Sequence, residues 1–173
     1  MAACVIRKMA QIVRTPPSFI PPGPIARVLN RLYGSLTRVG LSMPYSFLLS
    51  VPGRRTGEMR SVAVNLLHRN GKLFLVATRG NTQWARNTRA SGKIFLIRGS
   101  VRMEFFVRLI PDSEKPAVLQ SYLDRFKWMA WRFFPVSAGS PAAMFEPVAA
   151  RYPVFELIRI PPEIIPESSH FKE

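Results

Sequence analysis

The 173-residue chain predicts a fold that is mainly β with α: an antiparallel β-barrel with helices packed on its outside. Five or six short apolar segments have the length and spacing of β-strands, and most of them follow one another through tight turns. A long helical segment separates only the last two strands, whereas a parallel α/β sheet needs one between every pair. Apolar residues make up 47% of the chain, which is enough for one domain with a hydrophobic core.

Two helices are expected before the first strand. Residues 3–13 form an amphipathic pattern, with apolar side chains on one side and basic ones on the other, and the pattern stops at Pro16. Such a segment either packs on the domain or lies on an anionic membrane surface, and the sequence leaves both readings open. A second helix is expected over 24–40, where apolar residues recur every three or four positions. A short strand at 47–51 follows it.

The centre of the chain predicts a β-hairpin of strands 60–68 and 72–78, joined by the turn Arg69-Asn70-Gly71. Asn-Gly is a strong hairpin signal because both residues tolerate positive φ. Antiparallel pairing is expected to bring residue 78 beside residue 60. The two basic loops that flank the hairpin, 53–57 and 78–81, then meet at one end of the sheet.

The remaining elements follow the hairpin in order. A short helix is expected at 82–90, then strands at 93–98 and 101–110, a long helix at 114–133 and a last strand at 152–160. The long helix carries more aromatic side chains than one helix stripe needs. Packing in the core explains them best, and the wall of an apolar substrate pocket is the alternative. These aromatic residues are Trp128, Trp131, Phe133 and Phe134.

Positive charge is concentrated in the first two thirds of the chain. Residues 1–39 carry a net charge of +6 and residues 40–110 carry +10, whereas residues 111–173 carry −1. Such a field attracts a phosphorylated cofactor, nucleic acid or an anionic membrane face. Nucleic acid is disfavoured, because the aromatic residues are not interleaved with the basic loops.

The chain offers few side chains for covalent or metal-assisted catalysis. His68 lies beside the hairpin turn and His170 in the tail, so neither is well placed for a nucleophilic triad. Cys4 is the single cysteine and no zinc-ligand spacing occurs, so we expect no bound metal and a reducing compartment. An enzyme built from this chain therefore takes its reactivity from a cofactor.

Three parts of the chain are expected: a basic amphipathic segment with a Pro-rich link at 1–22, a barrel domain that binds a cofactor at 23–160, and a loose tail at 161–173. No run of eighteen apolar residues could span a bilayer, and basic residues interrupt the apolar start. The sequence predicts a cytoplasmic protein, with peripheral contact to the inner membrane face as an open possibility.

The glycine- and arginine-containing loops predict an anion site. Backbone N–H groups, guanidinium forks and hydroxyls converge there, and each charge-assisted hydrogen bond to a phosphate contributes roughly 1.5–3 kcal/mol. The sequence in this region also resembles a known family. The runs GRRTGEMRSVAV, ATRGN and WARNTRASGKIFLIRG, together with the Asn-Gly hairpin, are similar to the deazaflavin-dependent oxidoreductases, also called the deazaflavin-dependent nitroreductase family. The similarity extends over residues 30–158.

The resemblance implies a split β-barrel like that of the FMN-binding split-barrel flavoproteins. It also implies coenzyme F-420, a deazaflavin whose tail carries a phosphate and polyglutamate, with FMN as the alternative cofactor. The activity that it implies is hydride transfer from C5 of the reduced deazaflavin to an apolar or conjugated acceptor such as a quinone, an enone or a lipid-like molecule. A non-catalytic F-420 carrier and a basic membrane-surface protein are the rival functions.

The resemblance also implies which residues bind the cofactor. The arginines of the first loop contact the tail phosphate, and Gln83 and Trp84 line the deazaflavin, although Trp84 and Asn87 also suit a packed helix start. The full set is Arg54, Arg55, Thr56, Arg60, Ser61, Val62, Thr78, Arg79, Gly80, Gln83, Trp84 and Asn87.

This chain departs from the family pattern at two places. Ala63 stands where the family usually has proline after the loop arginine. The nitroreductase members carry a tyrosine cluster beside the substrate, whereas this chain has only Tyr122 in that region and Tyr152 before the last strand. Tyr122 is the candidate catalytic residue, as proton donor.

Overall fold

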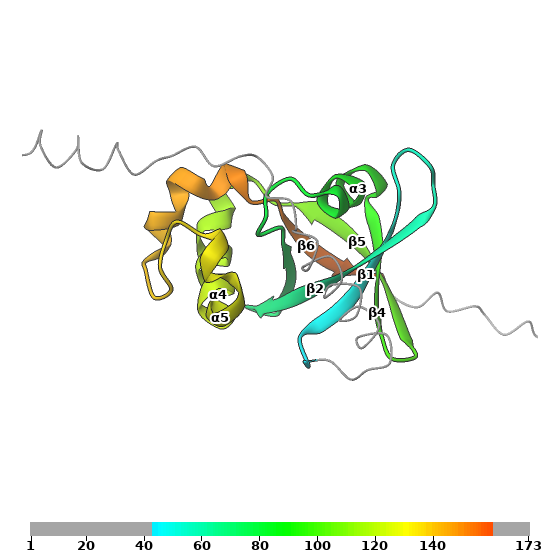
Figure 1. Ribbon diagram of the computed structural model, residues 1–173, viewed down its shortest axis with the longest axis horizontal. Helices are drawn as coiled ribbons and strands as arrows, with labels where there is room; N and C mark the ends of the chain where they lie inside the picture. Colours follow the sequence, from blue (N-terminus) through cyan, green and yellow to red (C-terminus); the bar gives the residue numbers. More distant parts are fainter. Residues whose placement is uncertain (1–42, 161–173) are drawn as a thin grey trace, which may run out of the picture.

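The computed structural model describes residues 43–160, and within that range the chain forms a closed six-stranded antiparallel barrel (Figure 1). The strands are adjacent in the order β1-β2-β3-β6-β5-β4, and β4 pairs with β1 to close the barrel. This arrangement confirms the predicted fold class. The strands are β1 Ser46–Pro52, β2 Met59–Arg69, β3 Lys72–Val76, β4 Lys93–Arg98, β5 Val101–Leu109 and β6 Val154–Arg159.

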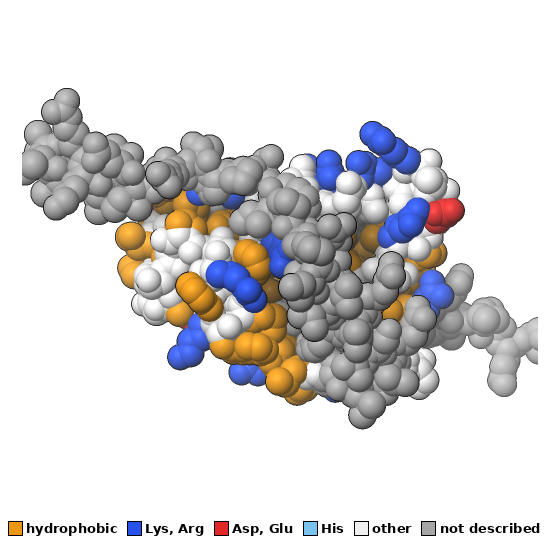
Figure 2. Space-filling model, viewed as in Figure 1, with side chains coloured by type: hydrophobic (Ala, Val, Ile, Leu, Met, Phe, Trp, Pro, Cys, Tyr) orange, Lys and Arg blue, Asp and Glu red, His pale blue; other side chains and the backbone are white. Residues whose placement is uncertain are grey.

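Helices pack at one end and on one side of this barrel. Figure 1 shows α3 at the end that carries the β1–β2 loop, and α4 and α5 together on one side. Figure 2 shows Lys and Arg side chains over the α3 end and hydrophobic side chains over the α4–α5 side. The α-helices are α3 Gln83–Ser91, α4 Lys115–Arg125 and α5 Lys127–Ala130, and the 3-10 helices are η1 Asp112–Glu114, η2 Trp131–Phe133 and η3 Ala142–Arg151.

The expected helices at 3–13 and 24–40 lie outside the described residues. The division of the chain at residues 22 and 160 therefore stays a prediction. Among residues 43–160, no helix reaches the length and hydrophobicity that crossing a bilayer requires.

The prediction of one long helix at 114–133 was wrong, because the helix is interrupted at Phe126. The backbone of Phe126 has φ −118° and ψ 26°, outside the helical region, while its side chain is only 1% exposed. α4 therefore ends at Arg125, and the short helices α5 and η2 follow the break. Residues 135–151, expected as a plain connection, contain η3, which begins after Pro141.

The Asn-Gly turn forms as expected, with φ 50° at Asn70 and 72° at Gly71. The predicted register was wrong, because Arg69 pairs with Lys72 and the turn has two residues instead of three. The N-terminal half of β2 pairs with β1, where Arg60 faces Val51, and β3 ends at Val76. Hairpin pairing therefore does not bring residue 78 beside residue 60.

Two hydrophobic clusters hold the described structure together. One fills the barrel interior around Leu49, Phe105 and Phe155, each no more than 1% exposed. The other lies between the barrel and the α4–η3 layer, around Phe126 and Phe145. Full burial of each such side chain stabilises the fold by about 1.5–3 kcal/mol.

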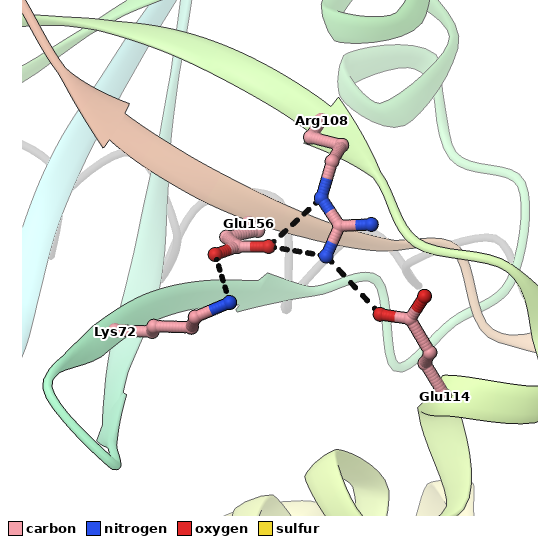
Figure 3. Close-up of polar contacts among 4 residues, drawn as sticks. All are labelled: Lys72, Arg108, Glu114 and Glu156. Atoms are coloured by element: carbon pink, nitrogen blue, oxygen red, sulfur yellow. Dashed lines mark hydrogen bonds and ion pairs between the residues drawn. The ribbon is translucent and has the colours of Figure 1, made fainter.

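A network of charged side chains ties three strands to the start of α4 (Figure 3). The carboxylate of Glu156 on β6 is buried, and it accepts hydrogen bonds from Lys72 Nζ on β3 at 2.8 Å and from Arg108 Nε on β5 at 2.9 Å. Arg108 also pairs with the exposed Glu114 at 3.1 Å. Lys72, with Arg108, holds the pKa of Glu156 below its ordinary value of 4.5, although burial acts in the opposite direction.

We expect Glu156→Gln to lower the free energy of unfolding at pH 7 by about 1.5–3 kcal/mol, because it removes the charge that satisfies two cations. Glu114→Gln is the matched control, since it touches the same Arg108 but is exposed, and its effect should stay under about 1 kcal/mol. Since the pKa of Glu156 is lowered on folding, its contribution is present above pH 4.5 and is lost as the pH falls below that value. Urea unfolding across pH 3–7 measures this, and equal midpoints for the two variants would contradict the assignment.

Candidate active site

A cavity of about 820 Å³ opens where the β1–β2 loop, β2, the loop after β3, α3 and the α4–η2 segment come together. This size is typical of a site for a small molecule or cofactor. Its lining takes residues from both hydrophobic clusters, including Val76 and Tyr122 from one and Val62 and Trp84 from the margin of the other. The cavity therefore lies between the two cores.

The structure brings together all but one of the residues singled out from the sequence. Gly80 does not line the cavity; its φ of 80° forms the turn that carries the chain from β3 to α3. The predicted site residues that do line the cavity are Arg54, Arg55, Thr56, Arg60, Ser61, Val62, Thr78, Arg79, Gln83, Trp84, Asn87 and Tyr122.

The two basic loops meet through Arg54 and α3. The guanidinium of Arg54 donates from Nη1 to Gln83 Oε1 at 2.9 Å and to Asn87 Oδ1 at 3.1 Å. The backbone N–H of Arg54 also points to Asn87 Oδ1, at 3.4 Å. Asn87 is only 6% exposed, so it is a fixed anchor for the loop. Arg54 thus positions the first loop, and its charge is directed at α3.

Arg55 and Arg60 differ in how free their charges are. Arg55 is exposed and makes no ion pair or hydrogen bond within residues 43–160. Arg60 donates to the carboxylate of Glu58, and both side chains are exposed. Glu58 itself does not line the cavity. Of these two arginines, Arg55 therefore offers an anion a free guanidinium, whereas Arg60 shares its charge with a carboxylate.

We expect Glu58→Gln to strengthen the binding of an anionic cofactor about threefold, or ~0.6 kcal/mol, because it frees Arg60 and removes a nearby negative charge. Glu104→Gln is the control, since it changes the net charge equally but pairs with Lys93 away from the cavity. Titration by intrinsic fluorescence measures both affinities. If both variants gain equally, the effect is one of net charge, and the local pairing does not limit binding.

The start of α3 is held in place by local contacts. The Thr82 hydroxyl accepts the backbone N–H of Ala85 at 3.3 Å and caps the helix. The Trp84 ring packs 5.9 Å from the Phe155 ring of the barrel core and also lines the cavity. Trp84 and Asn87 thus belong to a packed helix start and also line the cavity; that they lie against the deazaflavin stays a prediction.

A second wall of the cavity is apolar and comes from the α4–η2 segment, through Tyr122, Met129, Ala130 and Phe133. Burial raises the pKa of Tyr122 to about 12, and the contact with Asn65 offsets part of this increase. Tyr122 is therefore a neutral phenol at physiological pH.

The aromatic cluster divides among three environments. Phe134 packs in the core and Phe133 lines the cavity. Trp128 and Trp131 are 58% and 66% exposed, so the expectation of core packing was wrong for these two. Both tryptophans lie after the break at Phe126, in α5 and η2.

Sequence reasoning missed three lining residues that matter for the site: Asn65, Met129 and Arg132. Asn65 carried a signal, since it is a lone polar residue in the apolar run VAVNLL. Its amide accepts from Ser46 Oγ at 3.1 Å and donates to Met129 Sδ at 3.1 Å. Tyr152 does not line the cavity; its hydroxyl donates to the Phe133 carbonyl at 2.7 Å and so supports the wall.

The chain was compared with known proteins. Residues 26–127 match the model of the F-420H(2)-dependent quinone reductase family, which is more than half of the chain. A search of curated proteins finds no match. A solved structure described as a domain-swapped dimer is 16% identical, covers 91% of this chain and 100% of its own, and has a TM-score of 0.50, which shows a shared fold.

Two other solved structures that resemble the chain are named as reductases. An F-420-H2-dependent reductase is 18% identical, with 66% of this chain and 95% of its own covered and a TM-score of 0.47. An F-420 reductase is 17% identical, with 75% and 94% covered and a TM-score of 0.45. By the match of its family model, the chain belongs to the F-420H(2)-dependent quinone reductase family, and it is an oxidoreductase that uses coenzyme F-420.

Proposed function

We propose that this chain reduces an apolar or conjugated acceptor, such as a quinone, an enone or a lipid-like molecule, with reduced F-420 in the cavity. The observation that carries the proposal is the composition of the cavity wall. Five arginines line it and no Asp or Glu does so among the described residues, while α4, α5 and η2 add an apolar wall. An anionic cofactor and an uncharged acceptor suit these two walls.

The residues present fit F-420. Arg55 and Arg60 suit its phosphate, and Arg54 holds the loop that presents them. Val62, Gln83 and Trp84 supply apolar and amide surface for the ring system. When bound, the reduced deazaflavin supplies a hydride from C5. The protein contributes orientation and exclusion of water.

The acceptor is proposed to lie against Met129, Ala130 and Phe133. After hydride transfer, a reduced quinone or enone needs a proton at oxygen or carbon. Tyr122 is the proposed donor, because its side chain lines the cavity and its pKa of about 12 keeps it protonated. Asn65 orients the phenol from β2.

Titration of the purified protein with F-420 and with FMN tests the cofactor, with intrinsic tryptophan fluorescence as the readout. We expect F-420 to quench at micromolar concentration or below and FMN to have no effect. If only FMN quenches the fluorescence, the cofactor is FMN and not F-420. Mixing the protein and reduced F-420 with quinones and enones then tests turnover. If the absorbance of reduced F-420 persists with every acceptor, the chain is a carrier and not a reductase.

We also propose peripheral contact with an anionic membrane. Residues 1–15, which suggested it, lie outside the described residues, so its support is the exposed pair Trp128 and Trp131 with Lys127 beside them. Tryptophan favours the bilayer interface, and lysine favours anionic headgroups. Replacing both tryptophans by alanine should reduce co-sedimentation with phosphatidylglycerol vesicles several-fold. If this double variant binds the vesicles as well as the wild type does, the surface formed by α5 and η2 is not the one that contacts the membrane.

A further inference from the structure

Two arginines face the same aromatic ring on the cavity wall. Arg79 comes from the loop after β3, and Arg132 from η2. Their guanidinium carbons lie 4.9 Å and 5.4 Å from the centre of the Phe133 ring. All three residues line the cavity. The backbone of Phe133 is anchored, because its carbonyl accepts the Tyr152 hydroxyl at 2.7 Å.

No carboxylate compensates this pair of charges within the described part of the chain. The ion pairs found there involve other cations, and no Asp or Glu is among the lining residues. Arg79 is half-buried, and burial together with the charge of Arg132 lowers its pKa below the ordinary value. Two like charges held on one ring repel each other, and an anion placed between them relieves that repulsion.

We propose that Arg79 and Arg132 form a second anion subsite, which binds a carboxylate above the Phe133 ring. It is distinct from the Arg55–Arg60 site because its residues come from the loop after β3 and from η2. Guanidinium forks match the planar geometry of a carboxylate, and the ring fixes both forks by cation–π contact. The proposal rests on the proposed function, and it adds a charged group to what the cavity recognises.

A carboxylate can reach this subsite from two sources. The glutamate tail of F-420 carries several, and an acceptor with a carboxylate substituent on its conjugated system carries one. In the first case the subsite contributes to cofactor affinity, and it favours longer tails. In the second it selects charged acceptors over neutral ones of the same shape.

Arg132→Gln tests the subsite, because Arg132 is exposed and its replacement leaves the core intact. Arg125→Gln is the matched control, since Arg125 also stacks on a ring, that of Tyr45 at 5.8 Å, but does not line the cavity. Binding is measured by tryptophan fluorescence with F-420 that has or lacks its glutamates, and separately with 1-naphthoate and its neutral analogue 1-naphthylmethanol, without cofactor.

If the tail is the source, wild type binds the glutamate-bearing F-420 at least fivefold more tightly than the form without glutamate, and Arg132→Gln lowers this ratio to about one. If an acceptor is the source, wild type prefers naphthoate to naphthylmethanol by a similar factor, and the same variant abolishes that preference. If Arg132→Gln keeps both affinity ratios of the wild type and has the same melting curve, the subsite is overturned. Failure of wild type to bind any form of F-420 would instead defeat the proposed function, and the naphthoate arm would still decide the subsite.

Discussion

Arg55→Ala is expected to weaken F-420 binding tenfold or more, which is about 1.4 kcal/mol, because Arg55 is the loop arginine whose charge is free to meet the tail phosphate. Arg60→Ala is expected to have a similar effect, reduced where Glu58 already shares its charge. Because Glu58 already shares the charge of Arg60, the double variant should lose more than about tenfold but less than a hundredfold. Fluorescence titration at fixed ionic strength measures each dissociation constant, since these contacts weaken with salt.

Arg89→Ala is the control for charge alone. Arg89 lies exposed in the last turn of α3 and does not line the cavity. Arg89→Ala removes the same single positive charge from the protein, and it should change the affinity for F-420 less than twofold. Unchanged affinity in both Arg55→Ala and Arg60→Ala would mean that the cofactor tail binds away from the β1–β2 loop.

Tyr122→Phe is expected to lower kcat about a hundredfold while leaving the dissociation constant of F-420 within a factor of two. A positioned general acid contributes about 10²–10⁴ in rate, and the substitution removes the hydroxyl but keeps the buried ring. Because the pKa of Tyr122 is raised to about 12, its proton should remain in place between pH 6 and 10. Turnover should therefore show no loss that is attributable to Tyr122 across that range.

Tyr45→Phe is the matched control for this substitution. Tyr45 and Tyr122 both pack against the Phe126 ring, at 5.0 Å and 4.7 Å between ring centres, but Tyr45 does not line the cavity. Steady-state kinetics with a quinone acceptor should separate the two variants. Equal turnover in Tyr122→Phe and wild type would assign the proton to solvent or to another group.

Much of the fold follows from local sequence signals. Strand 93–98 was predicted with its observed bounds from its apolar run and the Gly99-Ser100 turn, and Gly99 has the positive φ, 58°, that such a turn requires. The Asn70-Gly71 turn formed for the same local reason. The pairing of β2 with both β1 and β3 depends on barrel closure, which no local pattern encodes, so the register was predicted wrongly.

The site was predictable as a set of residues but not as a set of contacts. Glycine and arginine in the two loops indicated an anion site, and the structure gathers these residues around one cavity. That Arg54 donates to Gln83 and Asn87 depends on the docking of α3, which no local pattern encodes. Arg132 lies in η2, after the break at Phe126, and the sequence pattern did not predict that break.

In the proposed function, two arginine-bearing loops, joined through α3, bind the charged tail of F-420 at one end of the barrel. A crystal structure of the protein soaked with F-420 tests it most directly. We predict the tail phosphate within hydrogen-bonding distance of Arg55 and Arg60, with the deazaflavin ring beside Trp84. A cofactor bound on the outer face of the barrel, or a phosphate that contacts neither arginine, would contradict the account.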